Sequence, residues 1–269
     1  MFANSSHEVS TVARSNVPFT QDGAKIKNFT FDLENMAPSK NYYTEFGKPD
    51  LLIHLAWQGL PNYDSPSHFE KYLMPQYHFL KNLIVNGLPK MVVTGTCLEY
   101  GMREGRLSED MIADPQIPYA LAKDTLRKFL ININQDVKMD LLWLRLFYMY
   151  GEGQNPKSLL AQLQSSINSG EQNFRMSPGD QMRDYLPVEK VAAIIKAIAL
   201  QDRVTGIINC CSGKPTRVKD LVEEYLKETH QHINLILGHY PYPSYEPKAF
   251  WGDDSRLNSI LKTSGNTPN

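Results

Sequence analysis

The sequence lacks features that would place it in several specialised classes of protein. No uninterrupted apolar run is long enough to span a bilayer, because Arg145 interrupts the most apolar stretch, residues 139–150. The polar first fifteen residues lack the apolar centre of a secretion signal. With 28 Lys and Arg against 29 Asp and Glu, there is no basic excess. We therefore expect a cytoplasmic protein without a nucleic-acid or membrane partner.

Cysteine and histidine are also few and scattered. Cys97, Cys210 and Cys211 have neither a metal-ligand spacing nor the pattern of a disulfide framework, so reduced, partly buried thiols are expected. His230 and His232 form the only close histidine pair, and without further ligands nearby they favour a surface loop. We expect no metal. The length of 269 residues and the 42% hydrophobic content are those of a globular protein with one large or two coupled domains.

Segments with strand character alternate with helical segments along the chain. A continuous apolar run, residues 51–56, is typical of a strand buried on both faces of a parallel sheet. Parallel neighbours need crossovers, which are usually helices. The pattern predicts an α/β fold with a doubly wound parallel sheet and ligands beyond the carboxyl ends of its strands. The predicted strands are residues 7–13, 27–31, 51–56, 91–93 and 140–146, and the predicted helices include residues 69–86, 188–200 and 218–229.

A possible proton-transfer pair opens another amphipathic run. On a helix, Tyr119 and Lys123 share a face, and a neighbouring cation lowers the pKa of a phenol from about 10, which would make Tyr119 a general acid or base. The spacing alone is weak, because Tyr77 and Lys81 share it, and packing on one helix face is the alternative for either pair. Thr96 and the Tyr119 pair follow a strand, where they can hold a carbonyl, so we interpret the other pair as structural.

Six stretches then carry a resemblance: DLLIHLA (50–56), VTGTCLEYG (93–101), PYALAK (118–123), LRLFYMYG (144–151), GDQMRDY with VEKV (179–191), and GIINCCSG (206–213). Each is weak alone, but together, in this order, they resemble the extended short-chain dehydrogenases/reductases, specifically the NAD(P)-dependent nucleotide-sugar epimerase/dehydratase family. The resemblance implies a Rossmann-like sheet in residues 1–151 and 183–209. It implies a smaller substrate lobe in residues 152–182 and 210–269.

The resemblance also implies roles at the catalytic centre and the cofactor. The Thr96 hydroxyl would bind the substrate oxygen, Tyr119 would be the acid/base, and Lys123 would hold the nicotinamide ribose and lower the pKa of Tyr119. Arg14, after the family's second strand, suits the 2′-phosphate of NADP, although NAD and an arginine without a special role remain alternatives. The other residues that match cofactor-binding positions are Asp32, Leu33, Leu55, Ala56 and Phe147.

At the substrate end, Arg183 matches an arginine that pairs with the sugar-nucleotide pyrophosphate. A surface ion pair with Asp180 or Asp184 is the alternative. Many relatives have Asn where this chain has Tyr148, so the sugar-phosphate end of the pocket is expected to differ. The loop from Tyr240 to residue 245 either stacks on a base or packs as a surface loop.

Two departures from the family narrow the expectation. The glycine-rich phosphate loop and the first strand are missing, so the chain is expected to begin near the family's second strand. Cys97 and Leu98 replace the Asp-Glu pair of the dehydratases, so dehydration is not expected.

We therefore expect an NAD(P)-dependent nucleotide-sugar oxidoreductase that reduces the C4 ketone of an NDP-4-keto-6-deoxyhexose, with polysaccharide biosynthesis as the usual context of such relatives. An epimerase with the same residues, and a non-catalytic sugar-nucleotide or protein-binding module, remain alternatives. A homodimer is a family expectation.

Overall fold

The structure, a computed structural model, describes residues 7–15, 26–242 and 245–263. Residues 1–6 of the polar start and residues 243–244 of the tyrosine-rich loop lie outside this part. The main body is a parallel sheet in the order β11-β6-β4-β3. Its strands are β3 (Leu52–His54), β4 (Lys90–Thr96), β6 (Asp140–Leu146) and β11 (Gly206–Cys210).

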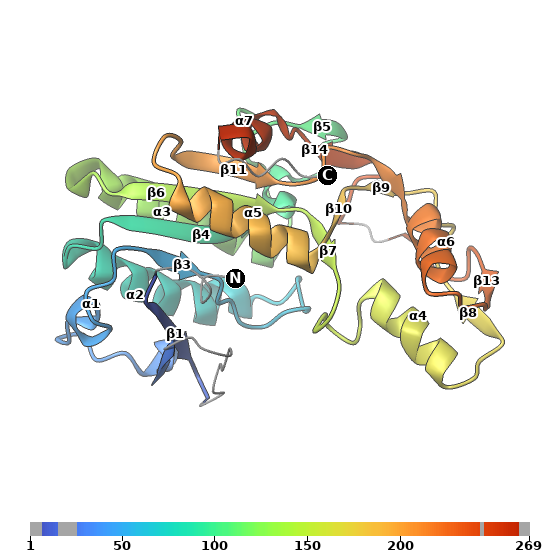
Figure 1. Cartoon of the computed structure of the whole chain (residues 1–269), viewed down its shortest axis with the longest axis horizontal. Helices are drawn as coiled ribbons and strands as arrows, with labels where there is room; N and C mark the ends of the chain where they lie inside the picture. Colours follow the sequence, from blue (N-terminus) through green and yellow to red (C-terminus); the bar gives the residue numbers. More distant parts are fainter. Residues whose placement is uncertain (1–6, 16–25, 243–244, 264–269) are drawn as a thin grey trace.

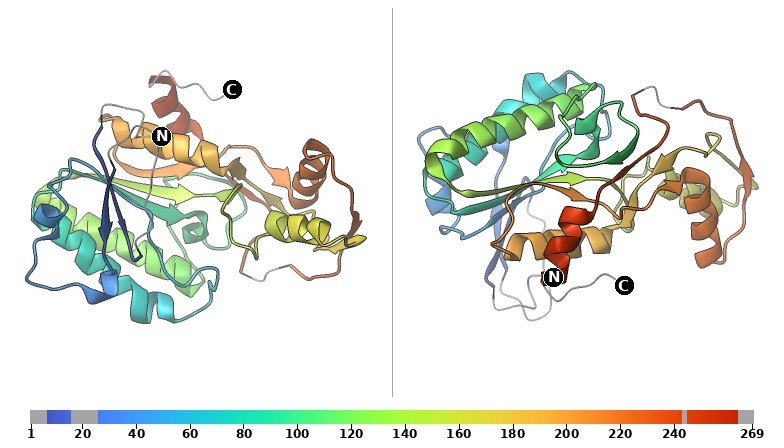
Figure 2. Two further views of the ribbon diagram at one scale, coloured as in Figure 1. Left: turned by 60° about the horizontal axis from the view of Figure 1, so that its bottom comes forward. Right: turned by 90° about the horizontal axis from the view of Figure 1, so that it is seen from above.

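Helices cover both faces of this sheet (Figures 1 and 2). α2 (Leu73–Val85) and α3 (Pro118–Val137) lie on one face, and α5 (Val188–Leu200) and α7 (Ser255–Thr263) lie on the other. The first of these helices is preceded by a π-helical turn, η3 (His68–Tyr72). This three-layer arrangement confirms the doubly wound α/β fold.

Apolar residues at helical spacing explain why these helices pack on the sheet. In α3, Ala122, Leu126 and Leu130 are four residues apart and fully buried, and they face Met91 and Trp143 of the sheet in one core cluster. Proline at the first helical position and Lys138 in a left-handed conformation after the last residue define the ends of α3. A second cluster fills the other face, between β6, β11, α5 and α7.

Two further strands, β1 (Val9–Ala13) and β2 (Ile26–Thr30), form a separate parallel pair. Among the described residues this pair is hydrogen-bonded to no strand of the β11-β6-β4-β3 sheet. The pair packs through Phe29 and Phe31 against α1 (Tyr42–Glu45) and Phe46, and η2 (Leu33–Asn35) follows it.

A smaller lobe lies beyond one end of the sheet (Figure 1). Its own core joins α4 (Leu159–Asn168), β8 (Asn173–Arg175), α6 (Val218–Glu228) and β13 (Asn234–Ile236). Part of the predicted lobe segment 210–269 lies elsewhere, because α7 packs against α5 and β11 of the body. The remaining strands form short pairs: β7 (Tyr148–Tyr150) with β10 (Tyr185–Pro187), β9 (Met182–Arg183) with β12 (Thr216–Arg217), and β5 (Gly105–Leu107) with β14 (Phe250–Gly252).

Candidate active site

Thr96, Tyr119 and Lys123 come from the carboxyl end of β4 and the start of α3, and we call them the candidate trio. Thr96 is the last residue of β4 and caps the 3-10 helix η4 (Cys97–Tyr100). The Thr96 side chain lies close enough to the Tyr119 phenol to lower the pKa of that phenol. The structure thus brings a phenol and a hydroxyl together where ligands bind in sheets of this kind.

Tyr119 is 8% exposed, and the rings of Tyr63 and Trp57 lie beside it, with centroids 5.5 and 6.0 Å away. Burial raises the pKa of Tyr119, and the neighbouring Thr96 side chain opposes this shift. The expectation that Lys123 lowers this pKa is therefore not met, because burial dominates. A phenol with a raised pKa is protonated at neutral pH and suited to donate a proton.

Lys123 is directed toward aromatic rings. Its Nζ lies 4.4 Å from the Trp57 ring centroid and 5.7 Å from that of Trp143, and the residue is 2% exposed. Burial lowers the pKa of Lys123 to about 8, and the charge of Glu99 opposes that shift. Burial, and next the Lys123 charge, lower the pKa of His54 to about 4, so this histidine is neutral at physiological pH.

Arg183, the predicted pyrophosphate ligand, is buried and already paired. Its Nη2 and Nε lie 2.9 and 3.3 Å from Glu246 Oε2, and its Nη1 donates to two backbone carbonyls. Asp180 instead pairs with Lys248, and Asp184 accepts hydrogen bonds from backbone N–H groups. The alternative of a surface ion pair with either aspartate is therefore wrong.

Tyr148 lies beside this ion pair. Its hydroxyl donates to Glu246, and its ring centroid is 6.0 Å from Arg183 Cζ. Burial, followed by the Glu246 charge, raises the pKa of Tyr148 well above its ordinary value. No local pattern in the sequence marks Glu246, because it is 63 residues from Arg183.

The residues matched to a cofactor follow three strands. Arg14 is exposed after β1, Asp32 caps η2 after β2 and accepts from Glu34 N at 3.1 Å, and Leu55 and Ala56 are exposed after β3. Side chains at the carboxyl ends of parallel strands fit the adenosine and nicotinamide ends of a dinucleotide. The described residues contain no glycine-rich loop that would hold its pyrophosphate.

Leu33 and Phe147, the other two residues matched to cofactor-binding positions, are less exposed than Arg14, Leu55 and Ala56. Leu33 is half-buried and packs against the main core, and Phe147 is 4% exposed in a cluster with Cys97, Cys211 and Phe250. The Phe147 ring is therefore part of a buried cluster and is not exposed to a ligand.

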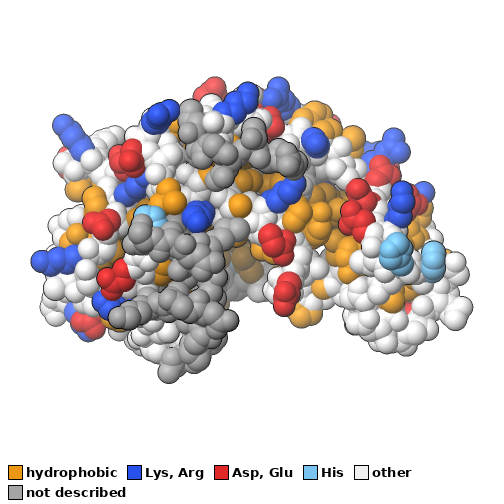
Figure 3. Space-filling model, viewed as in Figure 1, with side chains coloured by type: hydrophobic (Ala, Val, Ile, Leu, Met, Phe, Trp, Pro, Cys, Tyr) orange, Lys and Arg blue, Asp and Glu red, His pale blue; other side chains and the backbone are white. Residues whose placement is uncertain are grey.

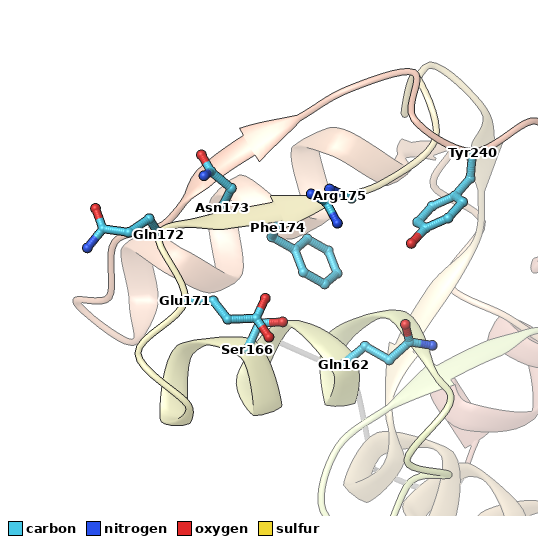
Figure 4. A pocket seen from close by; sticks show the side chains of 8 residues that line it. All are labelled: Gln162, Ser166, Glu171, Gln172, Asn173, Phe174, Arg175 and Tyr240. Atoms are coloured by element: carbon cyan, nitrogen blue, oxygen red, sulfur yellow. The ribbon is translucent and has the colours of Figure 1, made fainter.

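A pocket of about 350 Å³ opens in the smaller lobe, between α4 and β8 (Figure 4). Phe174 points into it from β8, Tyr240 borders one side, and Gln162 borders it from α4. Arg175 adds a positive charge at the rim. Glu171 also lines the pocket, so its charged groups are one cation and one carboxylate. Two aromatic rings and an amide suit a flat, polar ring. A second pocket, of about 600 Å³, lies on another face of α4.

The visible surface carries no block of one charge. In Figure 3, Lys and Arg are interspersed with Asp and Glu over the described part of that face. Among the described residues, no helix is long and apolar enough to cross a membrane. Within the same residues, no group of three or more His, Cys, Asp and Glu side chains is placed to hold a metal ion.

Sequence reasoning missed Trp57, Glu99 and Glu246. For Glu99 a signal existed, because Thr96 followed three residues later by glutamate is the capping-box pattern. Trp57 follows β3 in a turn region without periodicity, so nothing local marks it as a neighbour of Lys123.

Comparison with known proteins agrees with this geometry. Residues 1–211 match the NAD dependent epimerase/dehydratase family. The chain is 29% identical over 204 residues to the dTDP-6-deoxy-L-talose 4-dehydrogenase (NAD(+)) of Aggregatibacter actinomycetemcomitans, covering 76% of this chain and 75% of that protein. It is 25% identical over 182 residues to the dTDP-4-dehydro-6-deoxyglucose reductase of Escherichia coli, covering 64% of this chain and 57% of that protein.

Among solved structures, MoeE5 in complex with UDP-glucose and NAD has a TM-score of 0.81 at 23% identity, covering 100% of this chain and 87% of that one. This likeness confirms the Rossmann-like fold, and the family match confirms the resemblance seen in the sequence. Because that match covers more than half of its length, the chain belongs to the NAD-dependent epimerase/dehydratase family and is an enzyme of that kind.

Proposed function

We propose that the protein reduces the C4 ketone of a nucleoside-diphosphate 4-keto-6-deoxyhexose with a nicotinamide cofactor. The proposal rests on the neighbouring hydroxyls of Tyr119 and Thr96 near the carboxyl end of β4, with Lys123 on the same helix as Tyr119. The names of the two curated relatives, a dTDP-6-deoxysugar 4-dehydrogenase and a dTDP-4-dehydro-6-deoxysugar reductase, support the position of the ketone.

The protein's own residues act on the substrate oxygen. Tyr119 is protonated at neutral pH, because burial raises its pKa, and it donates this proton to the oxygen. The Thr96 hydroxyl orients the same oxygen by a hydrogen bond. The Lys123 ammonium adds a positive charge near the site, which favours negative charge developing on that oxygen. The nicotinamide, when bound, supplies the hydride.

We propose that the protein does not catalyse dehydration. Cys97 is 5% exposed, and burial raises the pKa of its thiol, so it cannot act as a base at neutral pH. Leu98 has no titratable group. The two positions that supply the acid and the base for water elimination in the family's dehydratases therefore carry no acid or base that acts at neutral pH here.

For the cofactor we propose NADP, held in part by Arg14. The side chain is exposed directly after β1, where a guanidinium can bind a 2′-phosphate. Arg14→Ala should raise KM for NADPH about tenfold and leave KM for NADH unchanged, while Arg203→Ala, an exposed arginine elsewhere, should change neither. A wild-type preference for NADH, or equal effects of Arg14→Ala on both cofactors, would point to NAD.

For the substrate we propose that Arg183 and Tyr148 bind the diphosphate region and that the β8 pocket holds the base. Glu246 now occupies the donors of Arg183 that a diphosphate would take. Because lysine cannot form the planar fork, Arg183→Lys should raise KM for the nucleotide sugar about tenfold. Arg217→Lys, an exposed arginine on the neighbouring strand β12, is the matched control. An unchanged KM in Arg183→Lys would remove Arg183 from the proposed site.

We also propose a homodimer. Large apolar side chains remain exposed on α2 and α3, namely Met74, Val85, Leu121 and Phe129. The rings of Tyr77 and Phe129 pack between the two helices with centroids 5.2 Å apart, so the exposed groups lie on a continuous two-helix surface.

Turnover with and without added NADPH separates the proposed reductase from an epimerase. A net reductase consumes one cofactor per product, whereas an epimerase retains its cofactor and consumes none. A shift of the melting temperature by NADPH tests the third alternative, because a non-catalytic module would show no turnover and no shift at millimolar cofactor.

A further inference from the structure

A buried carboxylate lies beneath the candidate trio. Glu99, in η4, is 0% exposed. Its Oε1 accepts a hydrogen bond from Thr96 N at 2.9 Å, and its two oxygens accept from Trp143 Nε1 at 3.0 and 3.1 Å. Its Oε2 lies 2.9 Å from Arg145 Nε and 3.9 Å from Arg127 Nε. One side chain therefore links η4, the end of β4, β6 and α3.

The first link holds Thr96. Glu99 accepts from the Thr96 backbone, and Thr96 Oγ1 accepts in turn from Leu98 N at 3.3 Å, so the two residues cap η4 reciprocally. The approach depends on Gly95, where a Cβ atom would lie 2.5 Å from Glu99 Oε1 and 2.2 Å from Trp143 Nε1. The backbone that carries the Thr96 hydroxyl is thus fixed by the carboxylate.

The second link reaches Lys123 through Trp143. Glu99 binds the N–H edge of the indole, and the Lys123 ammonium lies over the ring of the same residue. The negative charge of Glu99 raises the pKa of Lys123 against the larger effect of burial. Arg145 and Arg127 lie against Glu99, and Arg127 also pairs with the buried carboxylate of Asp124. Of the two carboxylates, Glu99 is the one whose charge raises the pKa of Lys123.

We propose that Glu99 is a positioning residue of the reduction. It fixes the backbone of Thr96 and, across the Trp143 ring, keeps the Lys123 ammonium charged beside the reacting oxygen. The proposal rests on the proposed function, because positioning has meaning only for a reaction at the candidate trio. A purely structural ion pair with Arg145 would stabilise the fold and have no effect on Lys123.

Carbon-13 NMR of the lysine Cε atoms measures the charge of Lys123 directly, with its signal assigned by its absence in Lys123→Met. The titration midpoint should be near 8 in the wild type and about one unit lower in Glu99→Gln. Asp124→Asn is the matched control, because this buried carboxylate on the same helix pairs with Arg127 and Lys128. The control should leave the midpoint within about 0.3 units.

This measurement uses neither substrate nor cofactor, so it stands apart from the proposed function. A midpoint unchanged in Glu99→Gln, with a lowered Tm, would overturn the proposal and leave a structural ion pair. If the midpoint falls but the wild type reduces no nucleotide sugar, the link to Lys123 holds and the role in reduction is overturned together with the proposed function. In an active enzyme, the alkaline limb of kcat should move with the midpoint.

Glu99→Asp covers the case in which Glu99→Gln does not fold. Aspartate keeps the charge but is one methylene too short to reach both Thr96 N and Trp143 Nε1. We expect the Lys123 midpoint to stay near its wild-type value while kcat falls about tenfold with little change in KM. A kcat equal to that of the wild type would overturn the positioning role.

Discussion

A lysine ammonium held between two indole rings is a costly feature for a folded protein. Lys123 is 2% exposed, and among the described residues no acidic side chain forms an ion pair with it. The rings of Trp57 and Trp143 lie near its ammonium group and partly compensate the cost of burying the charge. A buried charge of this kind is typical of sites where the charge is needed for chemistry rather than for stability. Replacing Lys123 and measuring the free energy of unfolding therefore tests the site without a substrate.

Lys123→Met should stabilise the protein at neutral pH. The shift from 10.5 to about 8 corresponds to roughly 3 kcal/mol, of which the lost cation–π contacts offset about 1 kcal/mol. Because the folded-state pKa is depressed, the unfolded wild type binds more protons between pH 8 and 10.5. The unfolding free energy of the wild type therefore rises across this window.

Urea unfolding at pH 7 and pH 10 checks this expectation. The variant should be about 2 kcal/mol more stable at pH 7, and its advantage should shrink at pH 10. Lys81→Met, at an exposed lysine 5.8 Å from the Tyr77 ring centroid, is the matched control and should show no such pH dependence. An advantage of Lys123→Met that is the same at both pH values would contradict the assigned shift.

At the scale of elements, one aspartate joins three segments. Asp184, between β9 and β10, accepts from the backbone N–H groups of Ser212, Gly213 and Gly252 at 2.7, 2.9 and 3.2 Å and is fully buried. It connects the turn after β11 with β14 and directly follows Arg183 in the chain.

Asp184→Asn should lower the free energy of unfolding by about 1–3 kcal/mol, because an amide has one acceptor oxygen and its NH₂ group would face backbone donors. Asp180→Asn, at a half-exposed aspartate four residues earlier, should change it by less than about 0.5 kcal/mol. Equal effects in urea unfolding would show that the three hydrogen bonds contribute little.

The elements themselves were largely readable from the sequence. The strand at residues 140–146 and the helix at residues 188–200 coincide with β6 and α5, because their apolar periodicity and their turn residues agree. Only residues 52–54 of the predicted strand 51–56 form β3, because Leu55 and Ala56 already lie exposed beyond its end. Thr96, Tyr119 and Lys123 could be proposed from the sequence because strand ends and helix spacing are local patterns.

The contacts that set the burial and the charge environment of the site could not be predicted from the sequence. The pairs Arg183 with Glu246 and Lys123 with Trp57 join segments far apart in the chain, and their burial follows from packing rather than from local sequence. The prediction that the pKa of Tyr119 is lowered was wrong for the same reason. This pKa depends on how deeply Trp57 and Tyr63 bury the phenol, which the spacing of Tyr119 and Lys123 does not encode.

At the scale of the whole molecule, the proposed dimer surface on α2 and α3 predicts an association state. Light scattering should give twice the chain mass of 30.7 kDa for the wild type. Phe129→Glu should yield a monomer, because a charge at a buried apolar contact is strongly unfavourable. Ile112→Glu, at a side chain 79% exposed in a loop, should leave the mass unchanged. A monomeric wild type would contradict the dimer.

The measurement that tests the central claim most directly is the rate of NADPH oxidation with a dTDP-4-keto-6-deoxyhexose, for the wild type, Tyr119→Phe and Tyr77→Phe. Tyr119→Phe removes one oxygen and should lower kcat by about 10²–10⁴-fold, with substrate binding retained. Tyr77→Phe, in the pair of equal spacing interpreted as structural, should keep the wild-type rate. Full activity in Tyr119→Phe would contradict the account, because the proton would then come from elsewhere.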